Sequence, residues 1–330
     1  MQRAKIISCG AYAPEKVIKN SYFDEQLGED VSTWLEENVQ IYERRWCAED
    51  ESTADLAEHA SLQALERAGL SATDMDLIIV STDTPEFISP STASVLQDRL
   101  GAEKAGTFDV NTACAGFVTA LDIASKYVAS DDQYRHILVV GAYAMSKHLN
   151  KQDKKTVTLF AVGAGVMILK AEKATDEEGF LDSELLSKGQ YNEWMGIYGG
   201  GTRMPVTNKI LENHDHQLKF VKRFPPTLNP EVWTGMIERL NDRIGVQSSE
   251  VNHFFITQIN INSIMETMDR LGADREKAAT VMHRFGYTGS ACIPMAFNEV
   301  WEKGNIHPGN LVYFVGSGGG LSFASAAFRM

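Results

Sequence analysis

The stretch FDVNTACAGFVTALDIASKYV, residues 108–128, decides the fold class, because it predicts a helix whose body is almost wholly apolar. Phe117, Val118 and Leu121 recur with Cys114 at the spacing of one helical face. Small apolar residues leave little polar surface on the other faces. We therefore expect a buried helix.

The start of this helix carries a single cysteine. Thr112 is a candidate N-cap, which would put Cys114 in the first turn. Unpaired backbone N–H groups and the helix dipole favour a thiolate there. Asp122 and Lys126 have the spacing of an i,i+4 ion pair. The pattern raises the question of whether the Cys114 thiolate does chemistry.

Composition excludes several classes of protein. The chain has 330 residues, 44% of them hydrophobic, so it can bury a large core. Its net charge of −13 argues against a nucleic-acid binder. No apolar run approaches the length of a membrane span and the first residues do not resemble a signal peptide, so we expect a cytoplasmic protein that does not enter membranes. The four cysteines are scattered without a CxxC, which suggests neither disulfides nor a metal site.

The chain reads as an α/β protein built from two similar halves. Strand-like runs alternate with helical patterns, among them TADLAEHASLQALERAGL, with Thr53 as its cap and Gly69 as its stop. From Asp76 to Cys114 is 38 residues and from there to Gly141 is 27. The matching intervals in the second half, from Val251 to Ser290 and on to Gly316, are 39 and 26 residues. Such agreement predicts an internal duplication.

The duplication sets the expected domain boundaries. Residues 1–172 form the first half, which carries the cysteine, and residues 173–330 form the second. The region of about 173–250 is more polar and richer in turn signals, so we expect an insertion there. A glycine cluster at 318–320 follows a predicted strand and could aim N–H groups at a developing oxyanion.

Six segments together resemble the β-ketoacyl-acyl-carrier-protein synthase III family of the thiolase superfamily. They are GAYAPEKVIKN, TPEFISPSTASVLQDRLG, DVNTACAGF, GGGTRMP, DRLGADREKAATVMHRFGYTGSACIPMA and GSGGGLSFASAAFRM. The resemblance implies a thiolase-like five-layered αβαβα fold, a homodimer, and a cysteine that takes an acyl group from coenzyme A or an acyl carrier protein, with no other cofactor and no metal. Cys114 matches that acylated cysteine.

Two positions depart from the family pattern. The family has a histidine in a PHQAN segment and an asparagine in a GNTS segment, where this chain has Thr257 and Tyr287. The family's pair polarises the malonyl thioester during decarboxylation, and neither replacement can accept a proton as imidazole does. A family Gly-Asp pair is also replaced, by Ala161 and Val162. The resemblance keeps the oxyanion hole, formed by the backbone N–H groups of Cys114 and Gly319.

The resemblance also assigns substrate-binding residues. Trp34 matches a tryptophan that grips the adenine of coenzyme A, and Lys154, with its neighbours in NKQDKKT, keeps positive charge near the phosphate site. Asn38 stands at an arginine-like position, which weakens the match. Phe87 and Asn260 complete the expected substrate-binding set.

Three functions remain open. The first is an acyltransferase that loads Cys114 from a thioester and passes the acyl group to an acceptor in a specialised, fatty-acid-like or polyketide-like pathway. The second is an ordinary decarboxylative synthase III, which Thr257 and Tyr287 oppose. The third is a non-catalytic partner in a heteromeric condensing complex, which the intact NTACAGF segment opposes. We favour the first.

Overall fold

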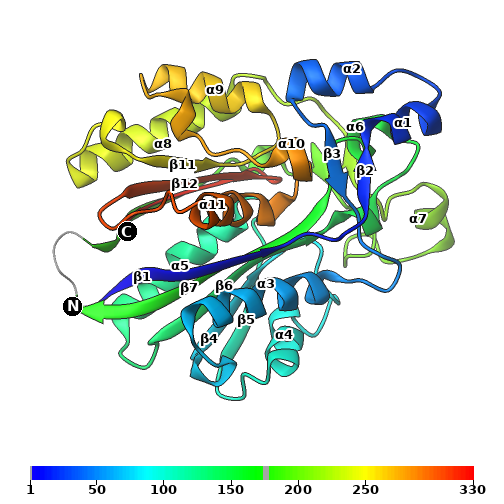
Figure 1. Ribbon diagram of the computed structural model, residues 1–330. Coiled ribbons are helices and arrows are strands. Elements are labelled where there is room, and N and C mark those ends of the chain that lie inside the picture. Colours follow the sequence, from blue (N-terminus) through cyan, green and yellow to red (C-terminus); the bar gives the residue numbers. More distant parts are fainter. Residues whose placement is uncertain (1, 174–177) are drawn as a thin grey trace.

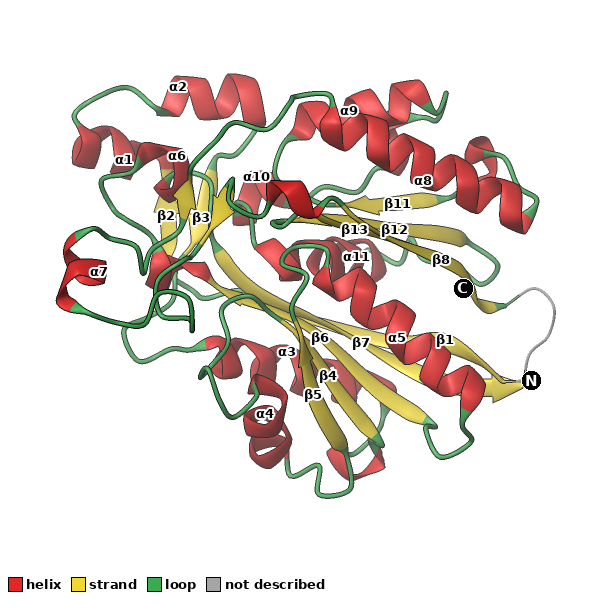
Figure 2. Cartoon of the chain, turned by 180° about the vertical axis from the view of Figure 1, so that it is seen from behind, coloured by secondary structure: helices red, strands yellow, loops and turns green. Residues whose placement is uncertain are grey.

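Helices and sheets alternate in five layers (Figures 1 and 2). The structure is a computed structural model that describes residues 2–173 and 178–330. One layer is a five-stranded sheet in the order β1-β7-β6-β4-β5, and another is a four-stranded sheet in the order β11-β12-β13-β8. Helices α5 and α11 lie between the two sheets, α3 and α4 cover one outer face, and α8 and α9 cover the other. The expected αβαβα architecture is confirmed.

The first half contains most of its strands in the five-stranded sheet. Its strands are β1 (Gln2–Tyr12), β2 (Val17–Lys19), β3 (Glu43–Arg45), β4 (Leu77–Ser81), β5 (Gly106–Val110), β6 (His136–Ala144) and β7 (Val162–Lys173). Its α-helices are α1 (Asn20–Leu27), α2 (Ser32–Trp34), α3 (Thr53–Ala68), α4 (Thr92–Leu100), α5 (Gly116–Ser130) and α6 (Lys154–Val157).

The second half is built in the same way. Its strands are β8 (Gly179–Ser187), β9 (Met195–Gly196), β10 (Lys219–Phe220), β11 (His253–Ile256), β12 (Leu311–Gly318) and β13 (Ser322–Arg329). Its α-helices are α7 (Asn208–Glu212), α8 (Leu228–Ile244), α9 (Ile261–Arg270), α10 (Met282–Phe285) and α11 (Cys292–Glu302), and a short 3₁₀ turn, η7 (Gly289–Ala291), leads into α11.

The two sheets repeat one topology. β4 and β6 run parallel, β6 and β7 antiparallel, and β7 and β1 antiparallel. β11, β12, β13 and β8 repeat these directions in the same spatial order. A single parallel bridge between Phe254 and Ala278 stands where β5 pairs with β4 in the first half. The two halves are therefore duplicates of one strand and helix plan.

The expected insertion at about 173–250 is corrected by this topology. The region contains β8 and α8, which hold the places of β1 and α3. Only residues 188–227 lie between those two elements, and the first half has a segment of the same length, residues 13–52, between β1 and α3. Both halves thus have a forty-residue connecting segment at the same point of the fold. The second half has no extra insertion relative to the first.

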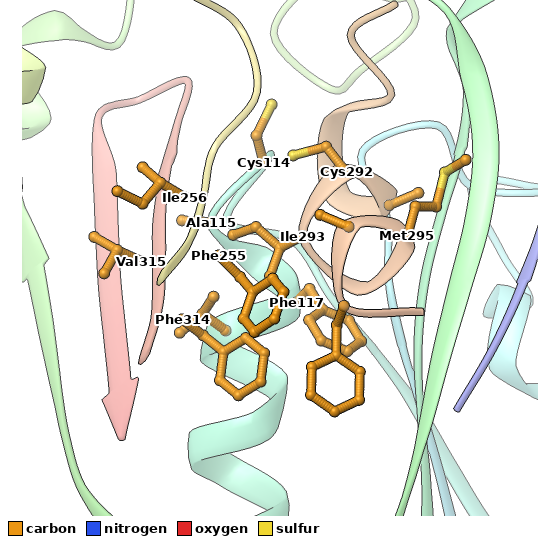
Figure 3. Close-up of a cluster of buried hydrophobic side chains, with 14 of the residues drawn as sticks. Cys114, Ala115, Phe117, Phe255, Ile256, Cys292, Ile293, Met295, Phe314 and Val315 are labelled. Carbon is orange, nitrogen blue, oxygen red and sulfur yellow. The ribbon is translucent and has the colours of Figure 1, made fainter. Parts of the chain in front are cut away.

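The two central helices start against the opposite sheet. A Cβ added to Gly141 of β6 would stand 2.3 Å from the carbonyl oxygen of Ser290, in the turn that leads into α11. A Cβ added to Gly316 of β12 would stand 2.9 Å from the Cα of Ala115, at the start of α5. Below these starts the space between the sheets is filled by apolar side chains, including Phe117 (Figure 3). The sequence landmarks that matched in spacing therefore meet in space.

Two helix starts differ from the sequence expectation. The cap of α3 is Ser52, whose side chain shares a capping box with Asp55, and Thr53 is the first helical residue. The N-cap of α5 is Ala115 rather than Thr112, whose hydroxyl lies 3.0 Å from that of Thr119. α3 still ends at Gly69, as expected.

Replacing either of the glycines that contact a central helix start, Gly141 or Gly316, should destabilise the whole protein. Gly141→Ala and Gly316→Ala each place a methyl group against backbone, and we expect each to lower the free energy of unfolding by about 1–3 kcal/mol. Urea unfolding measures this loss. Gly201→Ala is the matched control, because no atom lies within 4 Å of its added Cβ, and it should change stability by less than about 0.5 kcal/mol. Equal losses of stability at all three positions would contradict the view that Gly141 and Gly316 make room for the helix starts.

Candidate active site

A cavity of about 1150 Å³ extends from the surface down to Cys114. Both halves line it. The first half contributes Trp34, Asn38, Cys114, Lys154 and Lys155, and the second contributes Met195, Asn260, Tyr287, Ser317 and Gly318, among others. Its size exceeds that of most small-ligand sites and suits a long, flexible substrate.

The local backbone fixes Cys114 at the bottom of the cavity. The residue follows β5 and stands two positions before the first residue of α5, after Ala113 with a left-handed φ of 47°. A Cβ on Gly318 would come within 2.6 Å of the Cys114 nitrogen, so the end of β12 presses directly on this turn. The backbone N–H of Cys114 lies beside its own sulfur atom and acts to lower the thiol pKa.

The Cys114 sulfur is held as a neutral thiol, which corrects the expectation of a thiolate. The side chain is only 2% exposed. Burial raises its pKa well above the ordinary value, and the negative charge of Asp83 raises the pKa further. A hydrogen bond with Tyr287 lowers the pKa but does not overcome these effects. The helix start is thus too weak a source of positive potential to ionise a thiol this deeply buried.

Tyr287 is placed beside the thiol by main-chain contacts. Its N–H donates to the Leu159 carbonyl at 2.9 Å, and its carbonyl accepts from Ala161 N–H at 2.9 Å. Its ring lies 5.3 Å from that of Phe160. Gly286, with a φ of +67°, turns the chain into this position. Tyr287 and Ala161, two positions at which the sequence was expected to depart from the family pattern, are therefore direct neighbours.

Thr257 does not reach the cavity. It is fully buried. Its hydroxyl accepts a hydrogen bond from the Ser317 N–H at 2.9 Å and donates one to the Ser317 carbonyl at 3.4 Å. Those two contacts use the hydroxyl within the β11–β12 sheet. Of Thr257 and Tyr287, the two residues expected at the positions of the family's catalytic pair, only Tyr287 lies beside the thiol.

The remaining expected residues divide into two groups. Trp34, Lys154 and Asn260 line the cavity together with Cys114. Trp34 is about half exposed, and Lys154 forms a 2.8 Å ion pair with the exposed Glu29 at the mouth.

Two expected residues lie elsewhere. Gly318, not Gly319, makes the closest approach to Cys114. Phe87 is 51% exposed and does not line the cavity of its own chain.

Two features were missed by sequence reasoning. Lys222 and Arg223 line the mouth of the cavity, and their signal is the basic pair before two prolines in FVKRFPP. Asp83 lies close enough to Cys114 to shift its pKa, although no motif singled it out.

The histidines offer no replacement for the missing imidazole. Neither His148 nor His283 lines the cavity, and burial lowers the pKa of both. Within residues 2–173 and 178–330, no group of three or more His, Cys, Asp or Glu side chains could hold a metal ion. No helix in these ranges is long and apolar enough to cross a membrane.

Two profiles of one protein family match the chain. The profile of 3-oxoacyl-[acyl-carrier-protein] synthase III matches residues 108–189, and that of its C-terminal region matches residues 242–330. The chain belongs to this family.

Named relatives match over nearly the full length. The β-ketoacyl-[acyl-carrier-protein] synthase III of Staphylococcus haemolyticus is 35% identical over 97% of this chain and 96% of that protein. The enzyme of the same name from Staphylococcus saprophyticus is 36% identical over the same shares. The solved structure of the Thermus thermophilus synthase III superposes with a TM-score of 0.89 at 30% identity, covering 99% of both chains.

Membership in the family fixes the general class of chemistry. The family consists of acyl-transferring condensing enzymes, which are transferases of lipid metabolism. Its members use no cofactor beyond their acyl-coenzyme A and acyl carrier protein substrates.

Removing the Tyr287 hydroxyl should make the Cys114 thiol less reactive. Tyr287→Phe deletes the hydrogen bond that lowers the thiol pKa, so we expect iodoacetamide to alkylate Cys114 roughly tenfold more slowly at pH 8. Peptide mapping of the alkylated protein gives the rate at each cysteine. Tyr313→Phe is the control, because that buried hydroxyl donates to Asn241 far from the cavity. A Tyr287→Phe rate equal to that of the unchanged protein would show that the hydroxyl does not support the thiolate.

Proposed function

We propose that this protein is a cytoplasmic acyltransferase of the synthase III type that loads Cys114 from an acyl thioester. It then passes the acyl group to an acceptor in a specialised, fatty-acid-like or polyketide-like pathway. The reaction differs from that of ordinary relatives because decarboxylation of a malonyl thioester is impaired.

The observation that carries this proposal is the contrast between Tyr287 and Thr257. The Tyr287 hydroxyl lies close enough to the Cys114 thiol to lower its pKa, whereas the Thr257 hydroxyl accepts a hydrogen bond from the Ser317 N–H. The site therefore keeps a donor beside the nucleophile but has no pair of free donors for a malonyl thioester. Loss of one oxyanion donor typically costs on the order of a hundredfold or more in rate.

The mouth of the cavity supports a phosphate-bearing acyl donor. Lys154, Lys155, Lys222 and Arg223 line it, with Trp34 as an exposed aromatic surface. Coenzyme A and the phosphopantetheine arm of an acyl carrier protein both offer phosphates to such a cluster. Either donor fits this proposal.

The proposed enzyme is a homodimer. β5 is an edge strand of the five-stranded sheet, and edge strands offer unpaired backbone groups to another chain. In the same half, Phe87 is 51% exposed and Ile88 is 88% exposed. An apolar surface beside an open edge is what a homodimer would cover.

The ordinary decarboxylative reaction is the second candidate. It is favoured by relatives near 35% identity that are named for it. A non-catalytic role is disfavoured, because a merely structural subunit needs no cavity that leads to a buried cysteine outside any disulfide.

Exposure to a panel of acyl-coenzyme A and acyl carrier protein thioesters should leave one acyl group on Cys114. Intact-protein mass spectrometry would detect the added mass, and Cys114→Ala should abolish it. Cys292→Ala is the matched control, since Cys292 is equally buried nearby but does not line the cavity (Figure 3). An adduct that maps to Cys9, Cys47 or Cys292 would overturn the assignment.

Malonyl carrier protein should be decarboxylated slowly, at well below roughly 1 per second, which is the low end of usual turnover numbers. The physical reason is that only Tyr287 faces the reacting thioester. Release of labelled carbon dioxide measures the rate. Turnover at about 1 per second or faster would return the protein to the ordinary synthase III reaction.

A further inference from the structure

We infer that the Asp83 carboxylate accepts the proton of the Cys114 thiol when the acyl group is loaded. This role rests on the proposed acyl transfer through Cys114. A buried neutral thiol needs a base, because the nucleophile must lose its proton as it attacks. Asp83 would be that base.

Strand register places the two groups at the same edge. β4 runs parallel to β5 and β6, with Ser81 opposite both Val110 and Gly141. Asp83 lies two residues past Ser81, Cys114 follows Val110 in the next turn, and Tyr143 is two residues past Gly141. The carboxyl ends of three neighbouring parallel strands therefore bring these side chains together.

One oxygen of the Asp83 carboxyl, the buried Oδ1 atom, has no hydrogen-bond partner among the described residues. Two other acids at this edge are engaged, since Asp109 accepts from the Thr92 and Ala93 N–H groups and Glu86 accepts from the Ala54 N–H. A buried, unpartnered carboxylate oxygen costs stability unless it serves another purpose.

Electrostatics set the resting protonation states of Asp83 and Cys114. Burial raises the pKa of Asp83 to about 6, so the group is a carboxylate at neutral pH, while the nearby thiol stays protonated. The groups that share this environment are Cys114 after β5, Tyr143 on β6, and Tyr287 and Cys292 from the second half. Each is neutral at pH 7, because burial raises the pKa of each, so Asp83 is the base of the cluster.

The step balances without an added reagent. The thiol proton passes to the Asp83 carboxylate as Sγ bonds to the carbonyl carbon of the thioester. The bond between that carbon and the donor sulfur then breaks, and the departing thiolate takes the proton from Asp83. The products are acyl-Cys114, the free donor thiol and a restored carboxylate. Catalytic contacts of this kind tighten when substrate binds.

The test is the pH dependence of acylation in single-turnover mass spectrometry. The unchanged protein should acylate at a rate that rises through pH 6 and then levels off, since Asp83 is the group that must be ionised. Asp83→Asn should acylate roughly a hundredfold more slowly at pH 7, and its rate should keep rising beyond pH 9 as hydroxide ionises the thiol. Asp83→Glu keeps a carboxylate and should restore the plateau in part. Asp98→Asn, an exposed change on α4, should match the unchanged protein.

A second readout separates base catalysis from misfolding. The thiol pKa, read from the pH dependence of iodoacetamide alkylation, should fall in Asp83→Asn, because the negative charge that raises it is gone. A misfolded variant would lose acylation without this directed shift. An unchanged acylation rate and pH profile in Asp83→Asn would overturn the inference alone. Failure of the unchanged protein to acylate with any thioester would instead overturn the proposed function.

Discussion

The contact between each central helix start and a glycine of the opposite sheet constrains the rest of the molecule. Gly141 receives the turn that leads into α11, and Gly316 receives the start of α5, so neither half can place its central helix without the other. Cys114 stands where the two halves meet, under Gly318 of β12. The cavity is consequently a shared product of both halves, and side chains from distant parts of the sequence converge on one sulfur atom.

The chemistry of the site follows from the depth at which this contact buries the thiol. Exclusion of water strengthens each polar interaction that remains, and it also penalises the thiolate. Beside the thiol lie the Tyr287 hydroxyl, which lowers the thiol pKa, and the Asp83 carboxyl, one oxygen of which is buried without a hydrogen-bond partner among the described residues. The apolar Ala161 is in direct contact with Tyr287, since its N–H donates to the Tyr287 carbonyl.

Sequence reasoning was accurate where periodicity and spacing carry the information. The landmark intervals around Cys114 and Ser290 predicted the duplication, because a repeated strand and helix plan keeps its lengths. Predictions of properties that depend on three-dimensional surroundings were wrong. These were the N-cap at Thr112, the ionised state of the Cys114 thiol and the extra insertion in the second half. The resemblance assigned Thr257 to a catalytic position, but its hydroxyl accepts a hydrogen bond from Ser317, which lies sixty residues further along the chain. Asp83 was missed because a lone aspartate near a strand end has no local signature, and only the strand register brings it to the thiol.

Burial of Cys114 as a thiol also affects how fast its sulfur is oxidised. Peroxides oxidise thiolates much faster than thiols, and the first product, a sulfenic acid, leads on to irreversible sulfinic and sulfonic acids. Under the proposed acyl transfer, Cys114 would lose its proton only while a thioester occupies the cavity, and it would spend the rest of its time as the unreactive thiol. The low exposure and high pKa of this sulfur thus act as chemical protection, which an enzyme with a permanently ionised cysteine would lack.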